Sequence, residues 1–200
     1  RRHSFPTRRS SDQVKIKNFA TETYKGELIS AIPFTSTLNV SGTQFDWTND
    51  NTAIGLGVSG SGDIAAFTAL NTTNAPITAN IIVTPSTSSC VGIPDTFAIL
   101  VNPVPTVDAS TDQTLCNGES ITAIPFTSAL NVSGTQFDWT NDTPSIGLSA
   151  SGSGDIASFT AVNATNAPIT AMIIVTPSTT NCVGIADTIL ITVKPTPTVD

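Results

Sequence analysis

Residues 29–50, ISAIPFTSTLNVSGTQFDWTND, return 92 positions later at 121–142 as ITAIPFTSALNVSGTQFDWTND. The match runs without a gap from 29–108 onto 121–200, and 61 of its 80 aligned pairs are identical. A period of this length exceeds the roughly 20–50 residues of a solenoid unit and suits one small all-β domain. The chain of 200 residues is therefore expected to contain two copies of one module.

The composition and the local patterns indicate a folded β-protein. Apolar residues make up 39% of the chain and charged residues 12%, which is typical of a packed domain and not of a disordered one. Short apolar segments alternate with polar ones between clusters of Gly, Pro, Asn and Ser, and no segment shows sustained helical periodicity. Strands are expected in the second copy at 106–115, 120–126, 135–140, 145–149, 155–162, 168–177 and 186–194. About seven strands per module predict an all-β fold of two tandem Greek-key β-sandwich domains.

Prolines mark the ends of the modules. The segments NPVPTVD at 102–108 and KPTPTVD at 194–200 carry alternating prolines, which favour an extended, semi-rigid connection between successive modules. Upstream the repeat fades, because residues 17–28 share only Gly26 and Glu27 with 109–120. Either the first module has a variant start or the chain is chimeric there. The expected domains are repeat 1 at 13–103 with an atypical start to about 28, repeat 2 at 104–195, and the start of a further linker at 196–200.

The charge distribution excludes two classes of partner. Seven of the eight basic residues precede residue 26, and beyond it Lys194 stands alone against thirteen acidic residues. Such a body lacks the cations that replace phosphate counterions, so we expect no nucleic acid and no anionic membrane as partner. No run of 18 apolar residues occurs, so no membrane insertion is expected. Residues 1–12, RRHSFPTRRSSD, resemble translated sequencing-adapter DNA and are interpreted as an artefact or a disordered arm.

The side chains offer no catalytic centre. His3 is the only histidine and lies in this arm, so no Ser–His or Cys–His pair can form within the modules. Paired carboxylates at Asp46 and Asp50, or at Asp138 and Asp142, suit a solvated strand and turn better than acid–base catalysis. The glycine-rich runs at 55–62 and 147–154 lack a lysine and precede a strand, which excludes a phosphate loop and indicates a flexible turn or an irregular edge. We predict that the chain is not an enzyme and needs no cofactor.

Calcium binding is the alternative function for the acidic residues, because calcium takes several oxygen ligands. Four aspartates recur at the repeat distance: Asp46, Asp50, Asp63 and Asp95 return at positions 138, 142, 155 and 187. No D-x-D-x-D-G loop joins them, so no metal site is assigned.

One tryptophan occurs in each copy. Trp47 follows Phe45 by two residues and Trp139 follows Phe137 likewise, so each pair lies on one face of a strand. A single tryptophan paired in this way suits the core of a sandwich, and we predict that these four residues belong to the cores. The alternative is a platform on which a sugar stacks.

Comparison of the two copies orients the strands. Ile189, Ile191 and Val193 stay apolar relative to the first copy, whereas the residues between them change character. The unchanged face is expected to point into the core. Met172 replaces Asn80, so this position is predicted to face solvent.

Five asparagines begin N-x-S/T triplets: Asn39, Asn71, Asn131, Asn141 and Asn163. In a bacterial protein these acceptors are expected to stay unused.

The module resembles the PKD-like and immunoglobulin-like repeats of large, adhesin-like, gliding-motility-associated surface proteins of Bacteroidetes. The resemblance covers about residues 26–200 and rests on segments 103–107, 113–118, 139–141, 146–154, 159–161, 175–177 and 182–184. It implies β-sandwiches in a secreted, extracellular or cell-surface array with a non-catalytic structural or adhesive role. The implied partners are neighbouring repeats and surface glycans or proteins. The alternative function is a carbohydrate-binding accessory segment of a secreted glycan-degrading enzyme.

The resemblance also implies a disulfide. Related modules carry two cysteines, so Cys116 and Cys182 are expected to pair across the sandwich, which an extracellular compartment permits. Tyr24 stands where the first copy would have the partner of Cys90, so Cys90 is expected to be unpaired. The alternative is that all three cysteines are small apolar fillers with free thiols.

Overall fold

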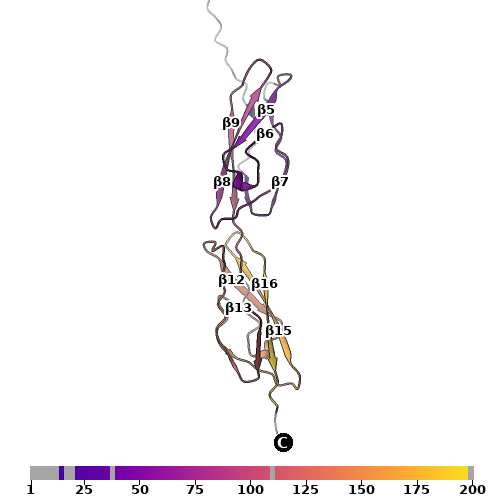
Figure 1. Ribbon diagram of the computed structural model, residues 1–200, viewed down its shortest axis with the longest axis vertical. Helices are drawn as coiled ribbons and strands as arrows, with labels where there is room; N and C mark the ends of the chain where they lie inside the picture. Colours follow the sequence, from indigo (N-terminus) through magenta and orange to yellow (C-terminus); the bar gives the residue numbers. More distant parts are fainter. Residues whose placement is uncertain (1–13, 16–20, 37–38, 109–110, 198–200) are drawn as a thin grey trace, which may run out of the picture. The chain divides into compact units, whose positions relative to one another are not determined.

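The computed structural model describes residues 14–15, 21–36, 39–108 and 111–197. The chain divides into two compact units, residues 1–103 and 104–200, and each is built from strands apart from one short 3₁₀ turn (Figure 1). This confirms the predicted all-β fold of two immunoglobulin-like β-sandwich domains. Residues 1–12, with His3, lie outside the described residues.

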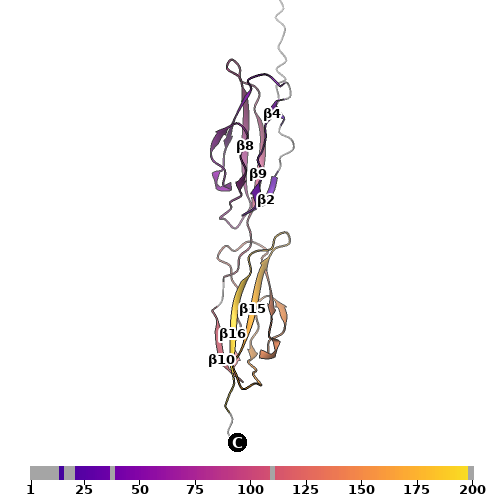
Figure 2. The ribbon, with the colours of Figure 1, turned by 90° about the vertical axis from the view of Figure 1, so that its right-hand side faces the viewer.

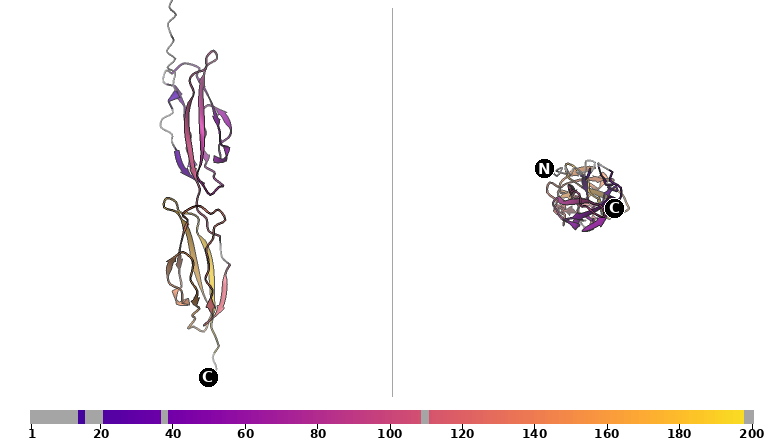
Figure 3. Two further views of the ribbon diagram at one scale, coloured as in Figure 1. Left: turned by 90° about the vertical axis from the view of Figure 1, so that its left-hand side faces the viewer. Right: turned by 90° about the horizontal axis from the view of Figure 1, so that it is seen from above.

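The main sheet of unit 2 has five strands in the order β10, β16, β15, β12 and β13. Their bounds are Gln113–Cys116, Asp187–Lys194, Ile169–Ser178, Gln136–Asn141 and Ser151–Ser153. The first and last strands of the unit, β10 and β16, pair in parallel, and the other neighbours pair antiparallel. Figure 2 shows β10, β16 and β15 side by side, and the left view of Figure 3 shows them from the opposite side.

A short second layer closes the sandwich of unit 2. It contains β11 (Ser120–Ile121) paired with β14 (Phe159–Thr160). An isolated bridge between Ile124 and Ile156 continues this pairing. Because Ile121, Ile124 and Ile156 are buried, this layer covers the inner face of the main sheet.

Unit 1 repeats this arrangement with sheet order β2, β9, β8, β5 and β6. The bounds are Thr21–Tyr24, Asp95–Asn102, Ile77–Ser86, Gln44–Asn49 and Ser59–Ser61. Its second layer pairs β3 (Leu28–Ile29) with β7 (Phe67–Thr68). In addition, β1 (Val14–Lys15) pairs with β4 (Thr35–Ser36).

The divergent start of unit 1 adopts the same register as that of unit 2. Tyr24 lies opposite Asn102 just as Cys116 lies opposite Lys194. The two residues that the copies share here build the following turn: Gly26 has φ +91 and Gly118 has φ +88, and the next residue in each is a glutamate. The Glu27 carboxylate accepts the backbone N–H of Tyr24 at 3.0 Å. The shared Gly-Glu pair therefore gives both copies the same turn after the strand, although the sequences of β2 and β10 differ.

Each unit has its own core, and the two cores correspond position by position. Every one of the fourteen buried residues of the second core lies 92 positions after a member of the first. Of the 19 differences between the copies, only Phe97, replaced by Ile189, falls among them. Ile191 and Val193 are buried and Met172 is 38% exposed, which confirms the faces predicted from the comparison of the copies.

The strand predicted at 145–149 is wrong. Residues Pro144–Ile146 form the 3₁₀ turn η2, which ends at Gly147 with φ +94. In unit 1 the equivalent turn η1 covers Thr52–Ile54 and ends at Gly55 with φ +92. A proline at the start and a left-handed glycine at the end favour a turn over a strand. Within the expected segment 106–115, the described strand is confined to β10.

The glycine of each Ser-Gly-Ser strand lies under the tryptophan ring. Trp139 pairs with Gly152 across β12 and β13, and a Cβ on Gly152 would lie 2.3 Å from Cζ2 of the ring. Trp47 and Gly60 have the same arrangement, also with 2.3 Å. These glycines are therefore required by a close side-chain approach. Of the two structures that the sequence suggested, a flexible turn or an irregular edge, they lie in the edge strand of the main sheet.

The predicted disulfide between Cys116 and Cys182 is wrong. All three cysteines are described, and no disulfide joins any two of them. Cys116 lies beside Lys194, the last residue of β16, whereas Cys182 lies in the loop before Asp187, the first residue of that strand. Eight residues of strand separate the two ends by roughly 20 Å, and a disulfide needs Cα atoms within about 7 Å. Cys90 and Cys116 are exposed and do not act as core fillers.

Replacing Gly60 by alanine should destabilise unit 1 by about 1–3 kcal/mol, because the added methyl group overlaps the Trp47 ring. Gly57→Ala is the matched control, since its Cβ would find no atom closer than 4.0 Å and its counterpart in the second copy is Ser149. Urea denaturation of the full chain followed by tryptophan fluorescence measures both variants. Equal stability of Gly60→Ala and Gly57→Ala would contradict the close packing.

Reduction should leave the thermal stability of the chain unchanged, because no disulfide constrains its unfolded state. The measurement is the melting temperature with and without dithiothreitol, together with a peptide map of the chain purified without reductant. A linked Cys116–Cys182 peptide in that map would refute the strand register.

Candidate functional site

The recurring aspartates each stabilise a different part of the fold. In unit 2 each carboxylate accepts a hydrogen bond. Asp138 accepts the hydroxyl of Ser153, and Asp142 accepts the backbone N–H of Met172. Asp155 accepts the backbone N–H of Phe126, and Asp187 accepts that of Thr188. Unit 1 has the same set with Asp46, Asp50, Asp63 and Asp95. Within the described ranges no group of three or more His, Cys, Asp or Glu side chains comes together. These carboxylates are therefore occupied by local hydrogen bonds and are not gathered as calcium ligands.

Hydrogen bonds keep two of these carboxylates ionised. The N–H of Met172, followed by the hydroxyl of Thr143, lowers the pKa of Asp142 below its ordinary value. The side-chain amide and then the backbone N–H of Asn80 lower the pKa of Asp50. A general acid near neutral pH needs a raised pKa, so neither aspartate suits that role.

Buried asparagines organise the loops of each unit. Asn163 is 4% exposed, and its Nδ2 donates to the carbonyls of Val193 at 2.7 Å and Ala167 at 2.9 Å. Its Oδ1 accepts the N–H of Thr165 at 2.8 Å. Asn71 is 0% exposed and makes the equivalent bonds in unit 1. One amide thus connects the last strand of the unit to the loop after β14.

Three of the five N-x-S/T asparagines are consequently closed to glycosylation in the folded chain. Asn71, Asn141 and Asn163 are buried, and the Nδ2 atom of each already donates to two carbonyls. Asn39 and Asn131 are exposed and have positive φ angles of 47° and 52°. Their side chains therefore stand on the surface of a loop.

The tryptophans lie in the cores. Trp47 is 8% exposed and Trp139 is 7% exposed, and Phe45 and Phe137 are half-buried against the same clusters. The indole Nε1 of each tryptophan is buried and has no hydrogen-bond partner among the described residues. Neither ring offers an exposed face on which a sugar could stack.

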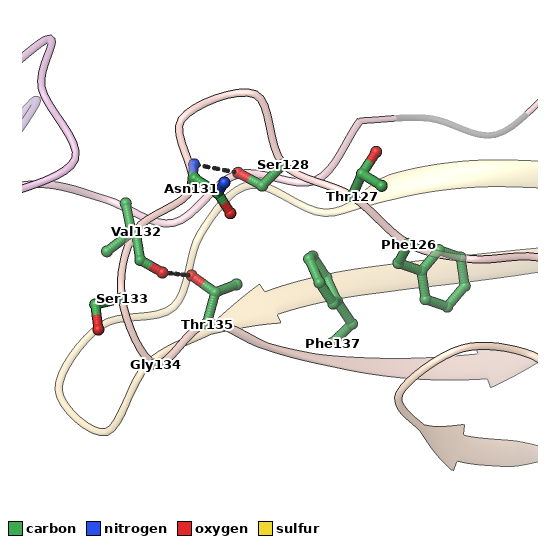
Figure 4. Close-up of a pocket in the computed structure, with 9 residues that line it drawn as sticks. All are labelled: Phe126, Thr127, Ser128, Asn131, Val132, Ser133, Gly134, Thr135 and Phe137. Atoms are coloured by element: carbon green, nitrogen blue, oxygen red, sulfur yellow. Dashed lines mark hydrogen bonds between the residues drawn. The ribbon is translucent and has the colours of Figure 1, made fainter.

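A hollow of about 420 Å³ opens in the loop that precedes β12. It is lined by Phe126, Thr127, Ser128, Asn131, Val132, Ser133, Gly134, Thr135 and Phe137 (Figure 4). The rings of Phe126 and Phe137 lie 5.9 Å apart at 53°. No charged side chain is among these residues, so the hollow combines an aromatic floor with hydroxyl and amide groups.

Hydrogen bonds within the loop hold this hollow open. The Thr135 hydroxyl donates to the Val132 carbonyl at 2.7 Å, and the Asn131 N–H donates to the Ser128 hydroxyl at 3.3 Å. Ser128 also contacts the Thr106 hydroxyl at 2.7 Å. Side-chain hydrogen bonds therefore fix the conformation of this loop.

The same residues recur in unit 1. Residues 38–50 and 130–142 are identical, the longest unbroken identical run between the copies. The rings of Phe34 and Phe45 lie 6.0 Å apart at 49°, close to the geometry in unit 2. Several residues of this run are exposed, so core packing does not explain why they are unchanged. This run was the signal by which the sequence could have indicated the hollow.

Sequence comparison assigns the module. Residues 113–197 match the family model described as a PKD-like domain. The matched segment covers β10 to β16, and unit 1 repeats its sequence and strand order. This segment is therefore similar to PKD-like domains, and the strand pairing of both units has the topology of an immunoglobulin-like sandwich. No curated protein was found to be similar in sequence.

Solved structures of immunoglobulin and adhesion proteins are similar at low identity. A three-domain immunoglobulin segment of titin is 9% identical with a TM-score of 0.48, and the match covers 92% of this chain and 66% of that one. The first two immunoglobulin domains of DIP-gamma are 12% identical with a TM-score of 0.42, covering 89% and 94%. The human desmocollin-1 ectodomain is 13% identical with a TM-score of 0.35, covering 88% and 39%. The fold is assigned from the strand pairing and not from these likenesses.

Replacing Asn163 by aspartate should destabilise unit 2 more at pH 7 than at pH 4. An ionised carboxylate would face the carbonyls of Val193 and Ala167, so its folded-state pKa would rise above the unfolded value. The free energy of unfolding of the variant therefore begins to fall below that of wild type as the pH rises above about 4. The difference grows until the pH passes the folded-state pKa of the new carboxyl group. Denaturation at both pH values measures it, with Asn166→Asp in the same loop as an exposed control. A pH-independent difference between the two variants would contradict the two carbonyl contacts.

Proposed function

We propose that the chain is a tension-bearing, non-catalytic spacer segment of a secreted, repetitive cell-surface protein. The observation that carries this proposal is the parallel pairing, in each unit, of the first strand of the five-stranded main sheet with the last strand of the unit. The PKD-like match supports a structural or adhesive module, because such domains are generally non-catalytic. No helix in the described part of the chain is long and apolar enough to cross a membrane.

The parallel pairing decides how a unit responds to a pull on its ends. In unit 2 tension draws β10 toward the N-terminus and β16 toward the C-terminus, in opposite directions along adjacent strands. The four paired positions from Gln113 opposite Ile191 to Cys116 opposite Lys194 are then sheared together. In an antiparallel hairpin pulled from one end, the bonds would instead open one after another. The unit must therefore lose several hydrogen bonds in one step before it unfolds.

Two further hydrogen bonds extend the contact between β10 and β16 at both ends. The Asp112 carboxylate accepts the N–H of Leu190 at 2.9 Å, and the Asn117 N–H donates to the Lys194 carbonyl at 2.8 Å. In unit 1 the Lys25 N–H donates to the Asn102 carbonyl at 3.0 Å. The bond that follows the first strand of the main sheet therefore recurs in both copies, which suits a segment that carries load along a chain of repeats.

The proposed setting follows the resemblance to surface proteins of Bacteroidetes. The neighbouring repeats of the same chain are the first partners, and surface glycans or proteins are the second. The acidic body, with one basic residue beyond residue 25, keeps an extracellular spacer from binding nucleic acid or anionic membrane.

A carbohydrate-binding accessory segment of a secreted glycan-degrading enzyme is the second candidate function. The hollow next to Phe126 and Phe137 favours it. The burial of Trp47 and Trp139 removes its most obvious sugar platform, so this function ranks below the spacer.

Pulling the full chain by its ends should give two abrupt unfolding events, each releasing roughly 300 Å of chain. Thr114→Pro and Leu115→Pro are tested separately, because alternate N–H groups of β10 point toward β16 and one of the two prolines removes a bond. Loss of one bond should raise the unfolding rate of unit 2 at constant force about fivefold. Gly152→Ala is the control, since it weakens the opposite edge of the same sheet. Gradual unfolding at low force, or equal effects of the control and the proline variants, would refute the tension-bearing role.

A further inference from the structure

We propose that the hollow of unit 2, defined by its nine lining residues, binds a neutral saccharide. This inference deepens the proposed function, because it gives the surface spacer a place and a chemistry for contact with glycans.

The aromatic floor provides an apolar face of the right size. Phe137 is half-buried, and its ring lies at 53° to that of the buried Phe126. Binding sites for small molecules combine such apolar surfaces with a few directed polar groups. The C–H face of a pyranose ring can pack on an aromatic ring of this kind, whereas a small ion cannot use it.

Asn131 supplies a donor and an acceptor side by side. Its φ of +52° is tolerated by asparagine, and Figure 4 shows its amide directed into the loop beside Ser128. Within the described ranges no side-chain hydrogen bond of Asn131 is formed. An amide presents an N–H donor and a carbonyl acceptor, which fits two neighbouring hydroxyl groups of a sugar. The hydroxyls of Thr127, Ser128, Ser133 and Thr135 lie around it.

The charge of the site and of its surroundings indicates a neutral ligand. None of the nine lining residues is charged, so the hollow has no cation to pair with a uronate or a sulfate. The acidic body around it repels anionic glycans. An amino sugar with a free ammonium group would likewise find no carboxylate in the hollow.

The loop sequence of the hollow is retained in unit 1, although Val40 is 41% exposed there and Val132 is 9% exposed in unit 2. In unit 1 the residues Asn39, Val40, Ser41, Gly42 and Thr43 are the same as those of the hollow. The phenylalanine pair has nearly the same separation in both units. Exposed positions elsewhere changed between the copies, for example Asn80 to Met172.

Saturation-transfer NMR and calorimetry of the full chain test the proposal with cellohexaose, xylohexaose and mannohexaose, and with hexagalacturonate as the charged comparison. At least one neutral hexasaccharide should bind, and hexagalacturonate should not. The Asn39→Gly/Asn131→Gly double variant should bind it at least tenfold more weakly, because glycine keeps the left-handed turn and removes the amide. Asn74→Gly/Asn166→Gly is the matched control, since both asparagines are exposed and lie outside the hollow.

A second variant covers the case in which the asparagine change disturbs the loop. Phe45→Leu/Phe137→Leu keeps the apolar volume and removes the ring face, and it should also weaken binding. Binding of none of the three neutral sugars, binding of hexagalacturonate alone, or unchanged affinity in both double variants would overturn the proposal. The unfolding force of the Asn39→Gly/Asn131→Gly variant should equal that of wild type, so failure of the saccharide site is distinguishable from failure of the spacer role.

Discussion

In each unit, the parallel pairing of the first strand of the main sheet with the last strand is the constraint on which the rest of the structure depends. It places the turn after β10 at the end of the unit from which the chain leaves, beside Lys194. The loop between β15 and β16 is thereby placed at the opposite end, together with Cys182. The same pairing attaches the first strand to the edge of the sheet without a disulfide and aligns both strands with any tension on the chain. The attachment of the first strand, the position of the cysteines and the direction in which the strands are sheared thus follow from one strand register.

The polar side chains of the module stabilise its own backbone. The repeated aspartates accept N–H or hydroxyl groups of the loops, and the buried asparagines hold carbonyls of the last strand. Groups that could ligate a metal or move a proton in another protein are occupied here. A small domain with one thin core benefits from such satisfied polar contacts. The use of these polar groups in hydrogen bonds within the module agrees with a structural role better than with a catalytic one.

The differences between the copies divide the surface into two classes. Several outward positions of the main sheet change, as when Ala98 is replaced by Leu190 across from Met172. The loop before β12 changes at none of thirteen consecutive positions, although several of its residues are exposed. Core packing accounts for Trp139 and Phe137 in that run but not for Asn131 or Ser133. The proposed ligand contact accounts for Asn131 and Ser133, which line the hollow.

The sequence by itself determined the number of modules, the β class and the inward faces of the long strands, because repetition and alternation are local properties. It also marked the Gly-Glu pair that turns the chain after the first strand. Only the tertiary structure decided which strands pair and in which register. That decision joins residues about 78 positions apart, such as Gln113 and Ile191, and no local pattern encodes it. The misplaced disulfide, the requirement for Gly152 beneath Trp139 and the burial of Asn163 all depend on that long-range register.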